Sequence, residues 1–100
     1  MELEQLRIFA AVAGEGSFTG AARKLYISHS TVSRAVSALE EELGVRLVER
    51  DNRVFGLTSA GEVLLEEARR LLAQAETAAE RVKAAAEKQT GDKDAVFQAI

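Results

Sequence analysis

The sequence predicts a mainly α fold, in which three short helices and a two-stranded hairpin precede one long helix. Apolar residues recur at helical spacing in four segments of the chain. Serine or threonine stands before three of these segments, where a hydroxyl can cap a helix, and glycine follows two of them, where helices commonly end. The 100 residues include no proline, which suits a chain built mostly of helices.

The first two helices are predicted to run from Leu3 to about Ala13 and from Phe18 to about Leu25. Gly14-Glu15-Gly16 ends the first helix, and Ser17 is placed to cap the second. The apolar stripe of the first helix consists of Leu3, Leu6, Phe9, Ala10, Val12 and Ala13. The expected buried positions of the second are Phe18, Ala22 and Leu25. Both patterns indicate helices that share a core.

The stretch from Ser28 to Leu43 predicts a third helix with two unlike faces, ended by Gly44. Its apolar stripe is Val32, Val36, Leu39 and Leu43. Its other face carries His29, Ser30, Ser33, Arg34 and Ser37, with no carboxylate before Glu40. A surface helix that only needs stability would usually carry Glu/Lys pairs there. Because only Tyr26-Ile27 separates the two helices, they form a helix-turn-helix, whose second helix enters the major groove of DNA.

Two short strands are predicted next, at Val45 to Glu49 and Val54 to Leu57, with Arg50-Asp51-Asn52-Arg53 as the turn between them. This hairpin, or wing, places two arginines at its tip. Arginines at such a tip are often only solvated, but in winged helices the wing commonly contacts the sugar-phosphate backbone. Both interpretations stay open for Arg50 and Arg53.

Thr58 is expected to cap a long helix from Ser59 to about Lys88. Its apolar residues form a heptad seam of Leu64, Ala68, Leu71, Ala75, Ala78, Val82 and Ala85. We expect the start of this helix to pack on the core of its own chain and the rest to need a partner, because a bare seam exposes much apolar surface. A solitary solvated helix is the alternative. Residues 89–100 are interpreted as a tail, or as the stub of a missing effector domain.

Composition and charge narrow the classes of function. The net charge is −3, but Gly16 to Leu39 contains no acidic residue while it contains Arg23, Lys24 and Arg34, and the local field steers a polyanion. With one histidine, no cysteine and no glycine-rich phosphate loop, we expect no enzyme, no cofactor and no metal site. Glu40-Glu41-Glu42 is interpreted as a solvated face. No segment is apolar enough to span a membrane and no signal peptide is recognised, so a cytoplasmic protein is expected.

Together these motifs resemble the N-terminal DNA-binding domain of LysR-type transcriptional regulators. The matching stretches are Leu3 to Phe9, Gly16 to Ala22, Ser28 to Gly44, and Leu57 to Gly61, within a resemblance that covers residues 1 to about 88. The resemblance implies a winged helix-turn-helix followed by a long linker helix, with linker helices packed antiparallel in a dimer and a ligand-sensing domain after them. His29 and Ser30 depart from the family, which most often has glutamine and often proline there, so the preferred base sequence is expected to differ.

The domain boundaries that follow are 1–58 for the winged helix-turn-helix, 59–88 for the linker helix and 89–100 for the tail. The expected DNA-binding residues are Ser28, His29, Ser30, Thr31, Ser33, Arg34, Ser37, Arg50 and Arg53. The expected dimerisation residues are Leu64, Ala68, Leu71, Ala75, Ala78 and Val82. The hydroxyl of Ser28 serves as a helix cap, a phosphate contact or both, and Arg34 takes either a guanine edge or a phosphate.

The expected partners are double-stranded DNA with an imperfect dyad and a second copy of the chain, with a small-molecule effector only if a C-terminal domain exists. Two alternatives remain at this point. One is a protein–protein interaction module that uses the long helix, which the acidic net charge favours slightly. The other is the DNA-binding domain of a different winged-helix family, such as molybdate-responsive regulators. Steep loss of affinity for random duplex DNA with salt distinguishes a DNA-binding domain from an interaction module.

Overall fold

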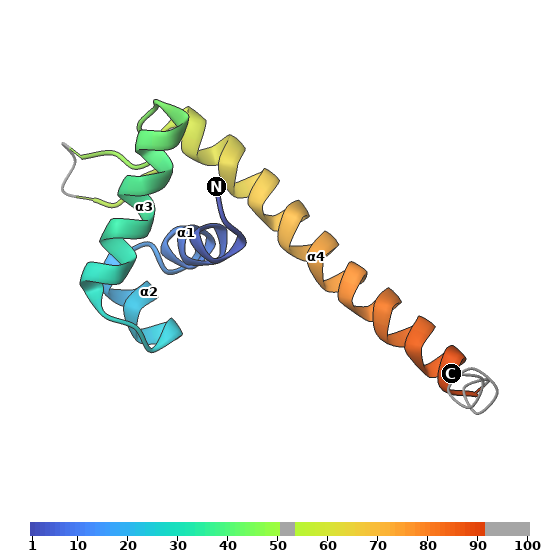
Figure 1. Cartoon of the computed structure of the whole chain (residues 1–100). Coiled ribbons are helices and arrows are strands. Elements are labelled where there is room, and N and C mark those ends of the chain that lie inside the picture. Colours follow the sequence, from blue (N-terminus) through green and yellow to red (C-terminus); the bar gives the residue numbers. More distant parts are fainter. Residues whose placement is uncertain (51–53, 92–100) are drawn as a thin grey trace.

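A computed structural model describes residues 1–50 and 54–91 of the chain. This part contains four helices: α1 (Leu3–Glu15), α2 (Phe18–Leu25), α3 (His29–Leu43) and α4 (Ser59–Gly91). The first three pack together, and α4 projects away from them as a long rod (Figure 1). All four expected helices are confirmed, although α1 ends at Glu15 rather than near Ala13, and α4 at Gly91 rather than near Lys88. The residues 51–53 and 92–100, which include most of the predicted turn and tail, lie outside the described part.

The predicted hydroxyl caps are confirmed at the starts of α2, α3 and α4. The caps are Ser17, Ser28 and Thr58, and in each case the amide nitrogen three residues further on donates to the hydroxyl, at 2.8, 3.1 and 3.0 Å. Gly16 and Gly44 follow α1 and α3 with φ angles of 71° and 70°, a left-handed conformation that glycine adopts at little cost. Contacts and conformations close in sequence therefore determine where these helices begin and end.

Helix α1 lies at the centre of the core, because it contacts α2, α3 and α4. Its buried surface is broader than the predicted stripe: Leu3 is 46% exposed, whereas Ile8 and Ala11 are buried together with Leu6, Phe9 and Val12. A helix covered by three others buries more than one face. In α2, Ala21 and Ala22 are buried, while Phe18 and Leu25 are only partly so. In α3, Val32, Val36 and Leu39 are fully buried and Leu43, in the last turn, is 42% exposed.

Residues 45–50 and 54–58, here called the arm, do not form the two predicted strands. One antiparallel bridge joins Val48 to Leu57, and the backbone nitrogen of Thr58 donates to the carbonyl of Leu47 at 3.0 Å. Successive side chains of a strand point to opposite faces, but Leu47 and Val48 are both buried. Both residues belong to the core cluster, and in the described part of the arm the antiparallel pairing is limited to this one bridge.

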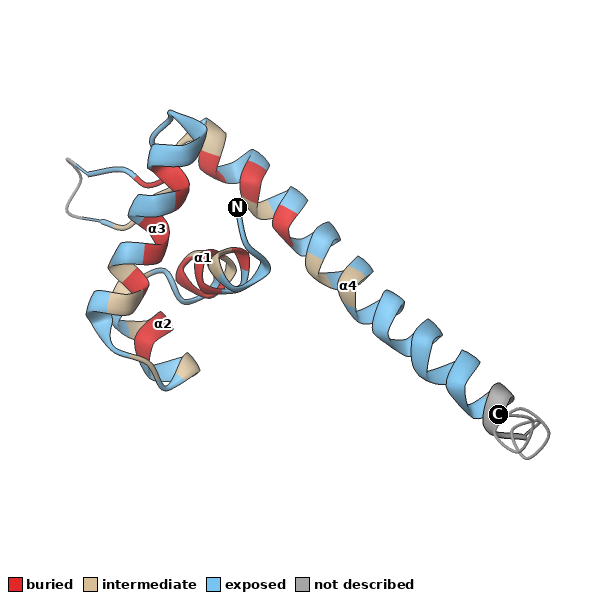
Figure 2. Ribbon diagram, viewed as in Figure 1, coloured by how far each residue is buried: buried red, intermediate tan, exposed pale blue. Residues whose placement is uncertain are grey.

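The start of α4 packs on the core of its own chain, as predicted. Leu64 and Ala68 are buried there, whereas Leu71 is 41% exposed and Val82 is 69% exposed. Figure 2 shows that the buried residues of α4 lie in its first turns; Leu72 and Ala75 are half-buried, and residues 76–87 are exposed. Leu64 and Ala68 therefore belong to the chain's own core. No helix in residues 1–50 and 54–91 has the length and apolar character that a membrane crossing requires.

Gly61 allows α4 to approach the arm closely. A Cβ atom built on Gly61 would lie 2.1 Å from the carbonyl oxygen of Leu47, a distance that forces the backbone of one segment to move. Gly14, inside α1, offers the opposite case, because a Cβ atom there meets nothing within 4 Å. A side chain at Gly61 therefore tests close packing, whereas one at Gly14 tests only helix propensity.

We predict that Gly61→Ala lowers the free energy of unfolding by about 1–3 kcal/mol, the usual cost of overpacking. Gly14→Ala is the matched control and should raise it by about 0.4–1 kcal/mol, because alanine restricts the unfolded chain and suits a helix. Urea denaturation followed by circular dichroism measures both changes. Equal effects of the two substitutions would contradict the close approach of α4 to the arm.

Candidate nucleic-acid interface

The outer face of α3 brings together four of the predicted DNA-binding residues. Ser30, Ser33, Arg34 and Ser37 recur at i, i+3, i+4 and i+7, so they share one side of the helix. Ser30, Arg34 and Ser37 are exposed and Ser33 is half-buried. Because the apolar stripe of α3 faces the core, this polar side is turned outward. It presents hydroxyl groups and one guanidinium, which are donors suited to base edges and phosphates.

The first turn of α3 holds three further predicted residues. The hydroxyl of Ser28 caps the helix and also lies 2.8 Å from the hydroxyl of Thr31, so both hydroxyls already have a partner within the chain. His29 is exposed, and its ring lies against Phe18 with centroids 6.0 Å apart, within the range of aromatic contacts. The imidazole thus has a fixed neighbour while its edge stays accessible.

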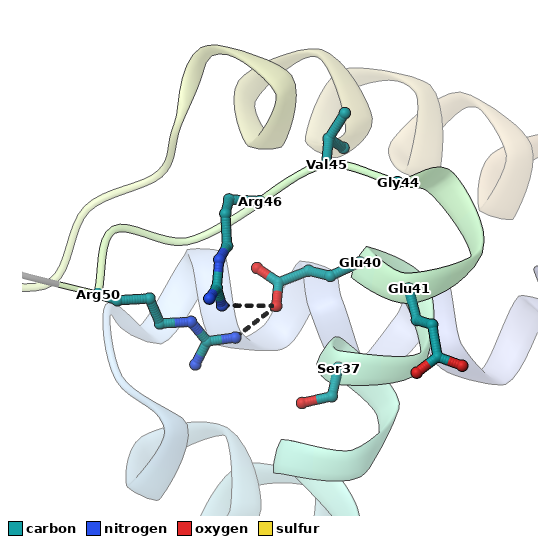
Figure 3. Close-up of a pocket in the computed structure, with 7 residues that line it drawn as sticks. All are labelled: Ser37, Glu40, Glu41, Gly44, Val45, Arg46 and Arg50. Carbon is teal, nitrogen blue, oxygen red and sulfur yellow. Dashed lines mark hydrogen bonds and ion pairs between the residues drawn. The ribbon is translucent and has the colours of Figure 1, made fainter.

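Of the two arginines predicted at the wing tip, Arg50 is described and Arg53 lies outside the described residues. The guanidinium of Arg50 donates to the carboxylate of Glu40, and its side chain is 38% exposed. Arg46 approaches the same carboxylate oxygen, with 3.8 Å between its Nη1 and Oε1 of Glu40. Figure 3 shows both arginines extending from the arm toward Glu40 on α3. Sequence reasoning placed Arg50 at a free tip, but the structure holds it against the body of the domain.

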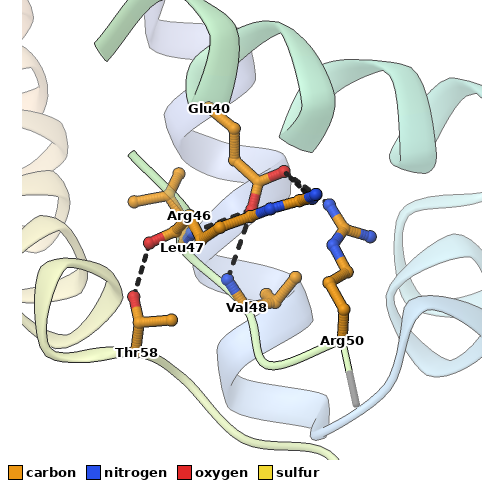
Figure 4. A network of polar contacts seen from close by, with 6 residues as sticks. All are labelled: Glu40, Arg46, Leu47, Val48, Arg50 and Thr58. Carbon is orange, nitrogen blue, oxygen red and sulfur yellow. Dashed lines mark hydrogen bonds and ion pairs between the residues drawn. The ribbon is translucent and has the colours of Figure 1, made fainter. Parts of the chain in front are cut away.

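Glu40 connects α3 to the arm. It is only 9% exposed, and its Oε2 accepts hydrogen bonds from the backbone nitrogens of Leu47 at 2.8 Å and Val48 at 3.4 Å. Figure 4 shows these bonds together with the arginines on the other oxygen. The interpretation of Glu40-Glu41-Glu42 as a solvated face is therefore wrong for Glu40, although Glu41 and Glu42 are exposed. Its spacing carried a signal: Glu40 follows Val32 and Val36 at intervals of four residues, on the buried side.

The environment of Glu40 favours its charged form. Burial raises the pKa of this carboxyl, but hydrogen bonds from the Leu47 amide, the Arg50 guanidinium and the Val48 amide, with the Arg50 charge, outweigh burial and hold the pKa below its ordinary value of 4.5. The carboxylate therefore remains ionised at neutral pH. It balances positive charge on the arm and satisfies two consecutive backbone donors.

An open hollow of about 710 Å³ lies between α3 and the arm. Its lining consists of Ser37, Glu40, Glu41, Gly44, Val45, Arg46 and Arg50. In the described part of the chain, no three His, Asp or Glu side chains converge in a way that could hold a metal ion. What the hollow does offer is the N–H groups of two guanidiniums and one serine hydroxyl beside the outer face of α3. Arg46 is the residue that sequence reasoning missed, because its position depends on the path of the arm.

We predict that Glu40→Gln lowers the free energy of unfolding at pH 7 by about 1–3 kcal/mol, since the neutral amide leaves a guanidinium less well paired in a buried site. A carboxyl whose pKa is lowered by folding contributes stability above its unfolded pKa, and that contribution is lost as pH falls through the folded value. The difference between wild type and Glu40→Gln should therefore shrink below about pH 4.5.

Urea denaturation at pH 7, 4 and 3 measures this difference, with Glu41→Gln as the control because Glu41 is exposed. A stability difference that stays constant over this range would show that Glu40 does not depend on its charge.

Known proteins resemble this chain in both sequence and fold. Residues 3–62 match the family described as "Bacterial regulatory helix-turn-helix protein, lysR family". The regulator ClcR of Pseudomonas putida is 48% identical over 92 residues, which make up 92% of this chain and 31% of ClcR. TfdS of Cupriavidus pinatubonensis is 43% identical, covering the whole of this chain and 36% of TfdS. The chain thus spans about a third of the length of these relatives.

Solved structures show the same architecture. The DNA-binding domain of CbnR in complex with DNA superposes with a TM-score of 0.81 and 45% identity, covering 86% of this chain and 99% of that one. The BenM DNA-binding domain with catB site 1 DNA gives a TM-score of 0.79 and 42% identity, covering 83% and 92%. The match to the family model covers more than half of the chain, and the relatives agree with it. The chain belongs to the LysR family of bacterial regulatory helix-turn-helix proteins.

Proposed function

We propose that this chain is the DNA-binding domain of a LysR-type transcriptional regulator and binds duplex DNA with α3 in the major groove. The observation that carries this proposal is the outer face of α3, where exposed Ser30, Arg34 and Ser37 stand without a carboxylate among them. The fold supports the proposal, since the solved CbnR and BenM domains that it resembles are complexes with DNA. ClcR and TfdS are named as transcriptional regulators, which supports a regulatory rather than an enzymatic role.

Within this proposal, each predicted DNA-binding residue contacts either the bases or the sugar-phosphate backbone. His29, Ser30 and Ser33 read base edges from the first two turns of α3, and Arg34 binds a guanine edge or a phosphate. Ser28, Thr31 and Ser37 contact backbone oxygens. The arm is the wing, and Arg50 and Arg53 are its contacts with the sugar-phosphate backbone. Residues 1–58 form the DNA-binding unit and 59–88 the linker helix.

The second part of the proposal is a homodimer through α4. Beyond Ala68 the seam is increasingly exposed: Leu71 is 41% exposed, Ala75 is half-buried, Ala78 is exposed and Val82 is 69% exposed. At the base of α4, the exposed side chains of Leu43, Val45 and Val63 border an open hollow of about 530 Å³ with Leu71. A second copy that packs its α4 antiparallel covers this apolar surface. Such a dimer presents two α3 helices to successive turns of DNA, so its site is an imperfect dyad.

We predict that Arg34→Ala weakens binding by about 1–3 kcal/mol if Arg34 contacts a guanine edge through two hydrogen bonds, and that it relaxes selection at one position. Selection of bound sites from a randomised duplex pool, for wild type and variant, measures affinity, dyad symmetry and half-site spacing together. Equal loss on all sequences identifies Arg34 as a phosphate contact. An unchanged affinity contradicts the placement of α3 in the groove.

We predict that Val82→Glu shifts the chain from dimer to monomer, because it places a charge in the apolar seam of both copies. Thr77→Glu is the matched control, since it adds the same charge to an exposed position of α4 outside the seam. Light scattering at micromolar concentration measures the mass of each variant. A monomeric wild type would overturn the seam, and so would a Val82→Glu variant that remains dimeric.

A further inference from the structure

Two guanidinium groups in the hollow between α3 and the arm share one counter-charge. Arg46 and Arg50 both approach Oε1 of Glu40. Arg50 is the close partner, whereas Arg46 stands 3.8 Å away with a side chain that is 69% exposed. Because Oε2 of Glu40 accepts from two backbone amides, the carboxylate has little capacity left for Arg46. Within the described residues, Glu40 is the acid that pairs with these two arginines, so the pair carries about one positive charge that Glu40 does not balance.

The other polar groups around the hollow fit an anion. Ser37 projects from α3 below the two arginines, and the carboxylate of Glu41 points away from them (Figure 3). Glu41 is the remaining acidic residue of the lining, and this orientation leaves the space beside Arg46 and Arg50 to hydrogen-bond donors. Two guanidiniums and a hydroxyl match the tetrahedral oxygens of a phosphate group.

With α3 in the major groove, as proposed, the hollow also lies on the path of the DNA backbone. The major and minor grooves of a duplex are separated by a ridge of phosphates. A protein that places α3 in the major groove and the arm over the adjacent minor groove must accommodate that ridge between these two elements. The hollow is the open space between them, and Ser37 stands both in its lining and on the outer face of α3. A phosphodiester of the DNA backbone is therefore the anion expected to lie in this hollow.

We propose that this hollow binds one phosphodiester of the DNA backbone, with Arg46 as its main contact and Glu40 as the positioning residue. This inference rests on the proposed function. Oxygens of the phosphodiester accept from the free N–H groups of Arg46 and Arg50 and from the hydroxyl of Ser37. Glu40 does not touch the DNA. It accepts a hydrogen bond from the guanidinium of Arg50, and its charge offsets the repulsion between Arg50 and the nearby Arg46.

We predict that Arg46→Ala weakens binding to all duplexes alike and lowers the salt dependence of binding. Each lost phosphate contact reduces the slope of log K against log salt by about 0.9 for each bound protomer. Between about 50 and 200 mM salt, the wild type should therefore lose about three- to fourfold more affinity per protomer than the variant. Arg69→Ala is the matched control, because Arg69 is an exposed arginine of α4 outside the lining of the hollow.

A second measurement locates the phosphate. Replacing single phosphates of a selected duplex by neutral methylphosphonates should reveal one position that weakens wild-type binding and has little further effect on Arg46→Ala. Thermal unfolding of both arginine variants accompanies the titrations; unchanged stability is expected for Arg46→Ala because that side chain is mostly exposed.

The outcomes separate the two proposals. If Arg46→Ala keeps the affinity and slope of Arg69→Ala while the wild type binds DNA, the phosphate site is wrong and the proposed function stands. If the wild type shows no salt-dependent binding to any duplex, the proposed function fails and the phosphate site fails with it. Additive effects of Arg46→Ala and every methylphosphonate also contradict the site.

Discussion

The arrangement of this domain depends on how the segment Arg46-Leu47-Val48 is held from two sides. On one side, the buried carboxylate of Glu40 accepts from the backbone nitrogens of Leu47 and Val48. On the other, the hydroxyl of Thr58 donates to the Arg46 carbonyl at 2.6 Å and the backbone nitrogen of Thr58 donates to the Leu47 carbonyl at 3.0 Å. Two amides of this segment are thus hydrogen-bonded to α3, and two of its carbonyls are hydrogen-bonded to Thr58 at the start of α4. Backbone groups buried without regular secondary structure need such partners, and here the partners connect the two helices on which function is proposed to depend.

In the dimer proposed above, this connection has consequences for DNA binding. Two α3 helices must fit successive turns of the duplex, about 34–36 Å apart. Their separation is set by the α4 pair and by the angle at which each α4 leaves its own domain. Leu64 and Ala68 hold the first turns of α4 on the core, and Thr58 connects its start to the arm. A change in this small region would therefore alter half-site spacing without touching a residue that faces DNA.

Much of this fold was predictable because its determinants are local. Ser17, Ser28 and Thr58 cap helices through contacts three residues away, and the two faces of α3 follow from helical spacing alone. The predictions from sequence were wrong at positions whose environment is determined by long-range contacts. Glu40 reads as one of three neighbouring surface acids, but the path of the arm brings two amides and two arginines to it. In the described part of the two predicted strands, the pairing is limited to the bridge between Val48 and Leu57. Leu64 and Ala68 continue the seam in sequence, but only the packing of α4 on α1 shows where the chain's own core ends.

Because the chain as a whole carries a net negative charge, DNA binding depends on where its individual charges lie. At a net charge of −3, the domain gains little from non-specific attraction to a polyanion. Acids on α4 are partly balanced within the helix, as where Arg70 pairs with Glu66 and Glu67, and Glu40 is withdrawn beneath two arginines. The outer face of α3 is left with hydroxyls, one imidazole and the guanidinium of Arg34. Such a domain depends on a few well-placed contacts rather than on a broad basic surface. At the proposed phosphate site, the loss of one arginine is then expected to matter more than it would on a strongly basic protein.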